Sequence, residues 1–278
     1  MEDASSWAER QWGEVDLGDH RRTRRAVTVG AAMAAQPAAG LPGQMGSWAG
    51  AKAAYRLLER PEVTLEAVTG QHRGATREAA SRARGPVLFV HDDTVIDLSS
   101  HWAMAGRGRI GDDRGRGLMA HGCLALRPGE VADEVLGLAA LTAWARPDAV
   151  KAKGETRTER NARRTEADVW AEAVEAVGPA PEGATWVSVG DRGADVFSHL
   201  ARARGIGWHV LVRVVQNRRL GEGDHLVDRL RSLAPMARRR ILPRGDGGRG
   251  PRQETWAEVA WTQVEVQPAR LRRDRSAP

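Results

Sequence analysis

Two short apolar runs, each followed by an acidic residue, constrain the fold of this chain most. The first run, residues 86–90, leads into Asp92, and the second, residues 185–189, leads into Asp191. Short apolar runs bounded by Gly or Pro are typical of buried strands. In open sheets with parallel strands, ligands collect at the carboxyl ends of the strands. If the two strands are neighbours, Asp92 and Asp191 face the same metal ion.

Two alternatives stay open for these aspartates. Asp93 competes with Asp92 for the first position, because alternation along a strand lets only one of two consecutive side chains face the site. Each aspartate also suits a purely structural role, in which it caps the turn or helix that follows. As ligands, the carboxylates of Asp92 and Asp191 would suit Mg²⁺ or Mn²⁺ and phosphoryl transfer with divalent ions.

The order of the predicted elements indicates the fold class. Helical composition covers residues 8–15, 21–35, 49–58 and 65–82. Strand patterns then cover residues 86–90, 118–126 and 135–141, with a helix at 165–177, a strand at 185–189, a helix containing Val196, Leu200 and Ala203, and a strand at 208–215. The second and third strands should form an antiparallel meander. A right-handed crossover would place the first and fourth strands side by side and parallel.

This order is that of the ribonuclease H-like fold. We therefore expect an α/β protein with an N-terminal helical domain followed by a ribonuclease H-like core. The expected helical domain is residues 1–85, and the expected core is residues 86–215, followed by residues 216–278.

The charge of the chain favours an anionic partner. The sequence has 42 basic and 36 acidic residues, a net charge of +6, and only three lysines. Arginine suits bidentate contact with phosphate, although a GC-rich genome would also raise the arginine content. One helix places Arg21, Arg22, Arg24 and Arg25 just after Asp19, a plausible N-cap. A solvated helix face would have the same composition.

The sequence also argues against several classes of protein. The single cysteine, Cys123, lies in an apolar run and excludes an internal disulfide and any multi-cysteine zinc site. The longest apolar stretch, residues 135–145, is too short to span a bilayer, and the N-terminus lacks the order of a signal peptide. We therefore expect a cytoplasmic protein without a membrane partner.

Several ordered motifs resemble one known family across nearly the whole chain. That family is the bacterial cut-and-paste DDE transposases of the transposon-five type, the insertion-sequence group with a YREK signature. The resembling segments are Trp7 with residues 17–25 (LGDHRRTRR), residues 52–56 (KAAYR), 91–97 (HDDTVID), 115–121 (GRGLMAH), 189–197 (VGDRGADVF) and 212–220 (VRVVQNRRL).

The resemblance implies roles for particular residues. The N-terminal module would bind double-stranded DNA at transposon ends, with the DNA-binding residues Arg21, Arg22, Arg24, Arg25, Lys52 and Arg56. The register of residues 91–97 selects Asp92 over Asp93 as the first catalytic carboxylate, and Asp191 becomes the second. Both would bind Mg²⁺ or Mn²⁺.

The departures from the family pattern concern catalysis. Asp93 stands where the family usually has Thr, and Gly193 where it often has Glu. The third family carboxylate is a Glu in a Tyr, Arg, Glu, Lys pattern, but the only tyrosine is Tyr55. The remaining candidates, Glu254, Glu258 and Glu265, lie in strand-like segments without that pattern. The resemblance therefore implies a chain truncated inside the family's β-rich insertion. Residues 1–85 would be the helical DNA-binding domain, and residues 216–278 would be an incomplete, partial β-rich insertion with a basic tail, of which residues 268–278 are unpacked.

The resulting expectation is a DDE transposase that lacks the third catalytic Glu and is catalytically incomplete. A second hypothesis is a non-enzymatic protein that occupies transposon ends and inhibits the full-length transposase, which would then be a partner. A third is a metal-dependent nuclease that works with two carboxylates.

Overall fold

The computed structural model describes residues 2–112, 114–147, 165–221, 223–242 and 254–267. Its contacts divide the chain into two compact units, Met1–Arg213 and Val214–Pro278. The first unit holds an N-terminal group of helices and a six-stranded sheet, and the second holds a two-stranded sheet with one helix.

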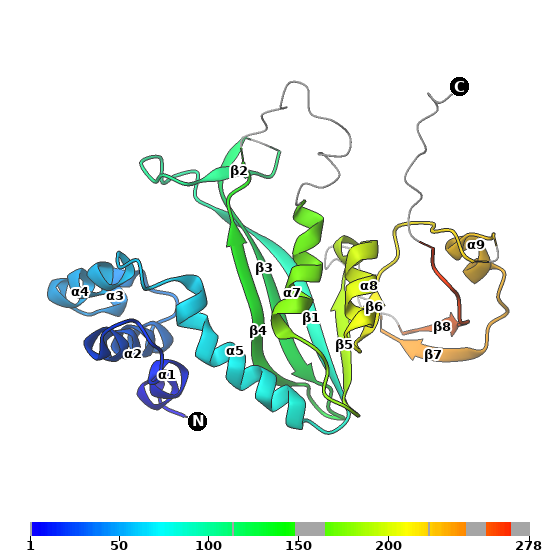
Figure 1. Cartoon of the computed structure of the whole chain (residues 1–278), viewed down its shortest axis with the longest axis horizontal. Helices are drawn as coiled ribbons and strands as arrows, with labels where there is room; N and C mark the ends of the chain where they lie inside the picture. The colour runs from blue at the N-terminus through cyan, green and yellow to red at the C-terminus, as the bar shows by residue number, and fades with distance from the viewer. Residues whose placement is uncertain (1, 113, 148–164, 222, 243–253, 268–278) are drawn as a thin grey trace. The chain divides into compact units, whose positions relative to one another are not determined.

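Helices form the N-terminal part of the described chain (Figure 1). They are α1 (Ala4–Trp12), α2 (His20–Ala35), α3 (Leu41–Gln44), α4 (Trp48–Leu58) and α5 (Leu65–Arg82). Asp3, Asp19, Ser47 and Thr64 each accept a hydrogen bond from a backbone amide in the first turn, which satisfies donors that have no partner within the helix. The four predicted helices are confirmed. Sequence reasoning missed α3, because its Leu-Pro-Gly start was interpreted as a turn.

The small core of these helices depends on the close approach of α1 and α2. Leu17, Val29 and Leu57 are buried in one cluster that joins α2 to α4. Gly30 of α2 lies against the Trp12 ring so closely that an added Cβ would lie 2.0 Å from Cζ3 of Trp12. The indole Nε1 of Trp12 donates to the Val68 carbonyl at 2.7 Å and so attaches α1 to α5.

The large sheet combines antiparallel and parallel strands. Its strands are β1 (Pro86–Asp97), β2 (Gly108–Ile110), β3 (Gly115–Arg127), β4 (Glu134–Trp144), β5 (Thr185–Gly190) and β6 (His209–Val212). The strand order is β2-β3-β1-β5-β6, and β4 also pairs with β3. The pairs β1–β3, β2–β3 and β3–β4 are antiparallel, whereas β1–β5 and β5–β6 are parallel. The predicted meander and the parallel pairing of the first and fourth strands are therefore confirmed.

One face of this sheet, the covered face, packs against helices. On β1 it bears Phe89, whose ring centroid lies 4.8 Å from that of Trp186 and 4.4 Å from that of Trp208. The same core contains Ala80 of α5, and it also contains residues of α7 (Val169–Val177) and α8 (Phe197–Gly205). Figure 1 shows α7 and α8 lying over the sheet. The short 3-10 turns η1 (Glu166–Asp168) and η2 (Arg192–Ala194) precede these two helices.

The other face of the sheet, the open face, carries the alternate side chains. Val90 pairs with Leu124 of β3 and with Val189 of β5, so these three residues lie on it together. Leu124 is 44% exposed, and Leu211 of β6, the partner of Val189, is 60% exposed. Apolar side chains on this face therefore remain in contact with solvent.

Several strand ends differ from the sequence prediction, and one strand was not predicted. β1 continues seven residues beyond Val90, because β3 pairs with it as far as Asp97. β6 ends at Val212, earlier than predicted, and the following Val214 and Val215 are exposed. The three-residue β2 was missed because its pattern is short and begins with Gly.

The described residues of the second unit form a short helix and a pair of antiparallel strands. These are α9 (Leu226–Arg231), β7 (Ala237–Ile241) and β8 (Thr255–Val259), with β7 and β8 antiparallel. The strand-like pattern around Glu258 is thus confirmed as β8. The tail expected at residues 268–278 lies outside the described residues. In the part of the chain that the structure describes, no helix is both long and apolar enough to cross a bilayer.

Candidate functional site

The candidate carboxylates belong to neighbouring parallel strands: Asp92 lies within β1, and Asp191 is the first residue after β5. β1 and β5 pair directly at Val90 and Val189, and each aspartate lies two residues further along the chain from its member of that pair. Asp92 is exposed and pairs with Gly122 of β3, where an added Cβ would meet nothing within 4 Å. The backbone of β3 thus leaves Asp92 accessible.

Each of these carboxylates accepts a nearby backbone hydrogen bond. Asp92 Oδ1 accepts from the Asp93 amide at 2.9 Å, and Asp191 Oδ1 accepts from the Gly193 amide at 2.7 Å. Asp191 is the N-cap of η2, so it does fill the structural capping role that the sequence left open. These backbone bonds engage Oδ1 of each residue, and both residues are exposed.

Asp93 has a different environment from Asp92. It lies on the covered face opposite His121 of β3, and its Oδ1 accepts a hydrogen bond from His121 Nδ1 at 2.6 Å. The His121 side chain is fully buried, whereas that of Asp93 is 37% exposed. Two consecutive aspartates therefore serve opposite sides of one strand.

The Asp93–His121 bond ends a buried chain of hydrogen bonds. His121 Nε2 lies 3.1 Å from His91 Nδ1, and His91 Nε2 lies 3.5 Å from the sulfur of Cys123. Because the Asp93 carboxylate only accepts, neutral His121 carries its proton on Nδ1 and accepts at Nε2. Neutral His91 then donates from Nδ1 and accepts the Cys123 thiol proton at Nε2. Burial lowers the pKa of His91 to about 3, which favours the neutral form.

A second group with a buried histidine joins α8 to β5. His199 Nδ1 lies 2.9 Å from the Ala194 carbonyl, and its Nε2 lies 2.9 Å from the Ser188 hydroxyl. The carbonyl only accepts, so the proton is on Nδ1, and the hydroxyl donates to Nε2. Burial lowers the pKa of His199. Sequence reasoning missed both histidine groups, because no local spacing shows which strands bring them together.

Among the residues that the structure describes, Asp92 and Asp191 belong to no larger group of potential metal ligands. Among the described residues, no group of three His, Cys, Asp or Glu side chains could hold a metal ion. In the second unit, Glu254 and Glu258 form ion pairs with Arg240 and Arg238 across the β7–β8 hairpin. Two carboxylate side chains with hard oxygen atoms suit Mg²⁺ in chemistry, but they are a partial ligand set.

One further acidic residue lies close to Asp191 in the chain. Asp195 follows η2, only four residues after Asp191, and is 7% exposed. Sequence reasoning did not single it out, although it is the second acidic residue of the 189–197 motif. Acidic side chains are rarely this buried unless they have a partner.

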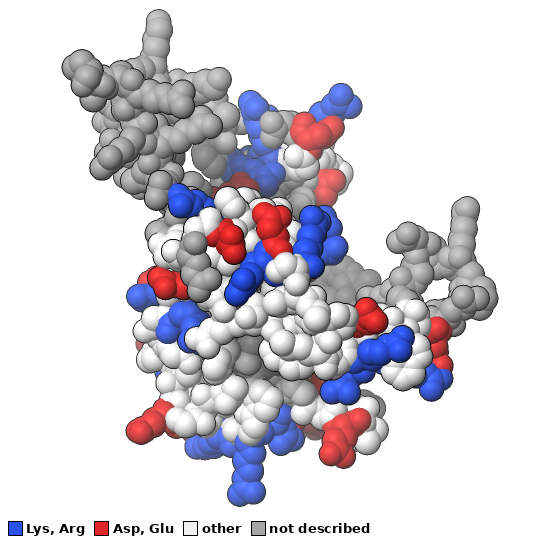
Figure 2. All heavy atoms as spheres, turned by 90° about the vertical axis from the view of Figure 1, so that its right-hand side faces the viewer, with Lys and Arg blue, Asp and Glu red and all other residues white. Residues whose placement is uncertain are grey.

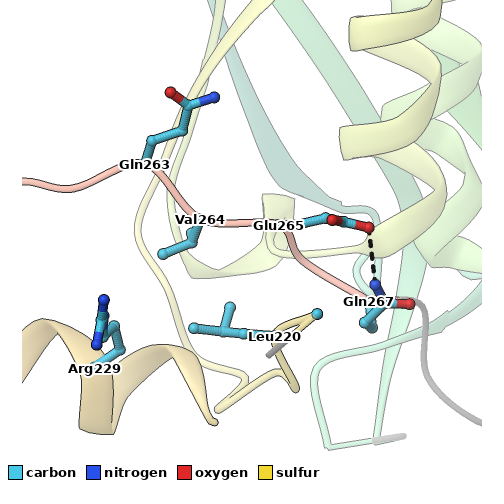
Figure 3. A pocket seen from close by; sticks show the side chains of 7 residues that line it. Leu220, Arg229, Gln263, Val264, Glu265 and Gln267 are labelled. Atoms are coloured by element: carbon cyan, nitrogen blue, oxygen red, sulfur yellow. Dashed lines mark hydrogen bonds between the residues drawn. The ribbon is translucent and has the colours of Figure 1, made fainter. Parts of the chain in front are cut away.

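The second unit contains a cavity of about 640 Å³ (Figure 3). Glu265, the last of the three candidate glutamates, lines it and accepts a hydrogen bond from Gln267 Nε2 at 3.0 Å. Arg229 of α9 and Leu220 also line it. The side chains that line the cavity are amide, aliphatic or charged, and none of these lining residues is a histidine or carries a hydroxyl or thiol nucleophile.

The arginines predicted to bind DNA have unequal environments on α2. The buried residues Thr23, Ala26 and Val29 define the inner side of this helix. Arg21, Arg24 and Arg25 are exposed on the opposite side. Arg22 differs, because its Nη1 donates to the Leu17 carbonyl at 2.9 Å and forms an ion pair with Glu62 at 2.7 Å.

Two more candidates lie on α4. Lys52 and Arg56 are both exposed and are one helical turn apart, so they share one side of the helix. The buried side of α4, which includes Leu57, packs with α2. The basic candidates thus belong to two helices that share one small core.

One face of the molecule shows basic and acidic side chains mixed together. On the face that Figure 2 shows, Lys and Arg side chains are interspersed with Asp and Glu. The net charge of +6 therefore does not form a continuous basic surface on this face.

The N-terminal helices match a known family. Residues 4–63, which contain α1 to α4, match the family model described as transposase DNA-binding. The match includes all six basic candidates on α2 and α4 and ends before α5. The match indicates an N-terminal transposase DNA-binding domain over these residues, which supports DNA as a partner.

Proposed function

We propose that this protein binds the ends of a transposable DNA element through α1 to α4 and holds the DNA against a core of the ribonuclease H-like, DDE class. The single observation that carries the proposal is the transposase DNA-binding match over helices whose exposed side bears Arg21, Arg24 and Arg25. Guanidinium groups on one exposed helix side suit contact with phosphates.

The strand arrangement supports the proposed core. Taken through β4, the strands run β4-β3-β1-β5-β6, with an antiparallel meander followed by two parallel strands. This is the arrangement expected of a ribonuclease H-like sheet. The proposed boundaries remain residues 1–85, 86–215 and 216–278.

In this proposal Asp92 and Asp191 are the first two catalytic carboxylates. Their place beyond the Val90–Val189 pair would let both reach one bound cation. Mg²⁺ or Mn²⁺ would supply Lewis-acid activation of a phosphodiester and charge stabilisation at the leaving oxygen. Asp93 is held by His121, which leaves Asp92 as the carboxylate of β1 for this role.

We further propose that this chain binds DNA ends without cutting or joining them. The described residues bring no third carboxylate to Asp92 and Asp191, and phosphoryl transfer depends mostly on positioning. A chain that occupies DNA ends in this way would inhibit a full-length transposase, its proposed partner. The alternative is a nuclease that works with the two aspartates.

Salt dependence tests the DNA interface. We expect the affinity of the full chain for duplex DNA to fall linearly in a log-log plot against salt, with a slope near 0.9 per phosphate contact. The triple variant Arg21→Ala, Arg24→Ala, Arg25→Ala should flatten that slope by up to about three. The matched control is Arg82→Ala, an exposed arginine of α5 outside the match. An unchanged slope in the triple variant would contradict the interface.

A cleavage assay tests the proposal that this chain binds DNA ends without cutting or joining them. DNA carrying the ends of the element should stay intact with Mg²⁺ or Mn²⁺, and plain plasmid should not be nicked. Nicking of plasmid that disappears in Asp92→Ala would support the nuclease instead. Excision or joining of the ends by this chain would overturn the proposal of binding without cleavage.

A further inference from the structure

The loop that follows β1 exposes a tryptophan on an ordered backbone. Trp102 is 83% exposed, in a loop of residues 98–107 that we name the Trp102 loop. Large aromatic side chains contribute most of their stabilisation when they are buried. An indole left in solvent therefore contributes little to folding.

A single side chain fixes the conformation of this loop. Arg107 donates from Nε to the Met104 carbonyl at 2.8 Å, from Nη1 to the Leu98 carbonyl at 2.9 Å and from Nη2 to the Trp102 carbonyl at 2.8 Å. The Leu98 amide also donates to the Arg116 carbonyl at 2.9 Å and attaches the loop to β3. The loop thus holds Trp102 outward in advance, which lowers the entropy that a ligand must overcome.

The surroundings of the loop are basic. Residues 98–116 contain four arginines and two aspartates. Arg109 and Arg116 lie directly opposite each other in the β2–β3 ladder, so their side chains share one side of this hairpin. An exposed aromatic ring among guanidinium groups is the combination that binds single-stranded nucleic acid by stacking and phosphate contact.

We propose that the Trp102 loop is a second DNA contact, at which the indole stacks on an unpaired base while the neighbouring arginines face the phosphates. This inference rests on the proposed function, because the loop continues the strand that carries Asp92. Bases in a duplex expose only their edges, so the flat face of Trp102 selects nucleotides that are out of the stack. The N-terminal helices would hold the duplex, and this loop would hold melted DNA.

The test compares two DNAs with the full chain. One is a duplex, and the other is the same duplex with three unpaired bases at its centre; affinities come from fluorescence anisotropy. We expect Trp102→Ala to lower the affinity for the unpaired DNA about tenfold, since stacking contributes that order per base. Affinity for the duplex should change less than about twofold. Trp102→Phe should restore most of the loss, because a phenyl ring still stacks.

Two further variants separate the explanations. Trp261→Ala removes another exposed tryptophan, which lies outside α1 to α4, and should leave the ratio of the two affinities unchanged. Arg107→Lys keeps the charge but cannot hold three carbonyls in one plane, so it should lower the ratio like Trp102→Ala. An unchanged ratio in Trp102→Ala would overturn the inference and indicate a protein partner instead. Failure of the wild-type chain to bind either DNA would contradict the proposed function itself.

Discussion

The two faces of β1 differ in how they use the same kinds of residue. On the covered face, Phe89, His91 and Asp93 belong to an aromatic core and a buried chain of hydrogen bonds. On the open face, Val90 and Asp92 border solvent and the end of β5. Alternation along one strand thus places the side chains that stabilise the fold on one face and the proposed functional carboxylate on the other.

The strongest test of this separation removes the core aromatic. Phe89 is fully buried between two tryptophan rings. We expect Phe89→Ala to lower the free energy of unfolding by about 3–5 kcal/mol, because it creates a cavity. Urea denaturation measures this. Leu211→Ala on the open face is the control, and an equal loss there would contradict the comparison.

The two consecutive aspartates give a matched pair. Asp93→Ala leaves the buried His121 Nδ1 without its acceptor, so we expect a loss of about 1–3 kcal/mol. Asp92→Ala removes an exposed side chain and should leave the free energy of unfolding unchanged. Thermal and urea unfolding of both variants check this. Greater destabilisation by Asp92→Ala would show that the two faces have been assigned wrongly.

Two glycines test the space on each face. A Cβ at Gly190, on the covered face, would lie 2.4 Å from the Ala194 Cβ and 2.8 Å from the Trp170 ring. Gly190→Ala should therefore destabilise by about 1–3 kcal/mol through overpacking. Gly122→Ala, opposite Asp92, meets nothing within 4 Å and should cause no loss. Similar unfolding midpoints for the two variants would count against this packing.

Acid should weaken the covered face gradually. Burial lowers the pKa of His91 to about 3, whereas the unfolded chain has a histidine pKa near 6.5. The unfolded state therefore binds more protons below pH 6.5, and stability is complete above that pH and falls toward pH 3. The expected slope for this residue is about 1.4 kcal/mol per pH unit. In His91→Gln, the slope measured between pH 5.5 and 4.5, where the unfolded histidine is almost fully protonated, should decrease by that amount; no decrease would argue against a buried neutral His91.

Much of the sheet could be predicted because each strand is a local pattern. The runs at residues 86–90 and 185–189 show their hydrophobic character and their acidic ends without any knowledge of neighbours. The parallel pairing of β1 and β5 followed from the helix between them and the handedness of such crossovers. Element order thus carried the prediction of topology.

The buried polar groups could not be predicted in this way. His91 and His121 are 30 residues apart and meet only because β1 and β3 pair in one register. Alternation also left Asp92 and Asp93 as rivals, since no residue in the run itself states which face is covered. The pairing with β3 distinguishes their environments, because it places Asp93 opposite His121, which donates a hydrogen bond to it.

The backbone hydrogen bonds of the two candidate carboxylates provide a spectroscopic handle on them. Asp92 Oδ1 accepts from the Asp93 amide, and Asp191 Oδ1 accepts from the Gly193 amide. Any cation drawn to either carboxylate withdraws electron density from the oxygen that the amide proton touches. In a ¹⁵N-resolved NMR titration with Mg²⁺, the Asp93 and Gly193 cross-peaks should therefore move together and with one midpoint. A shared midpoint for these two amides would indicate one cation site, and two different midpoints would indicate two separate sites.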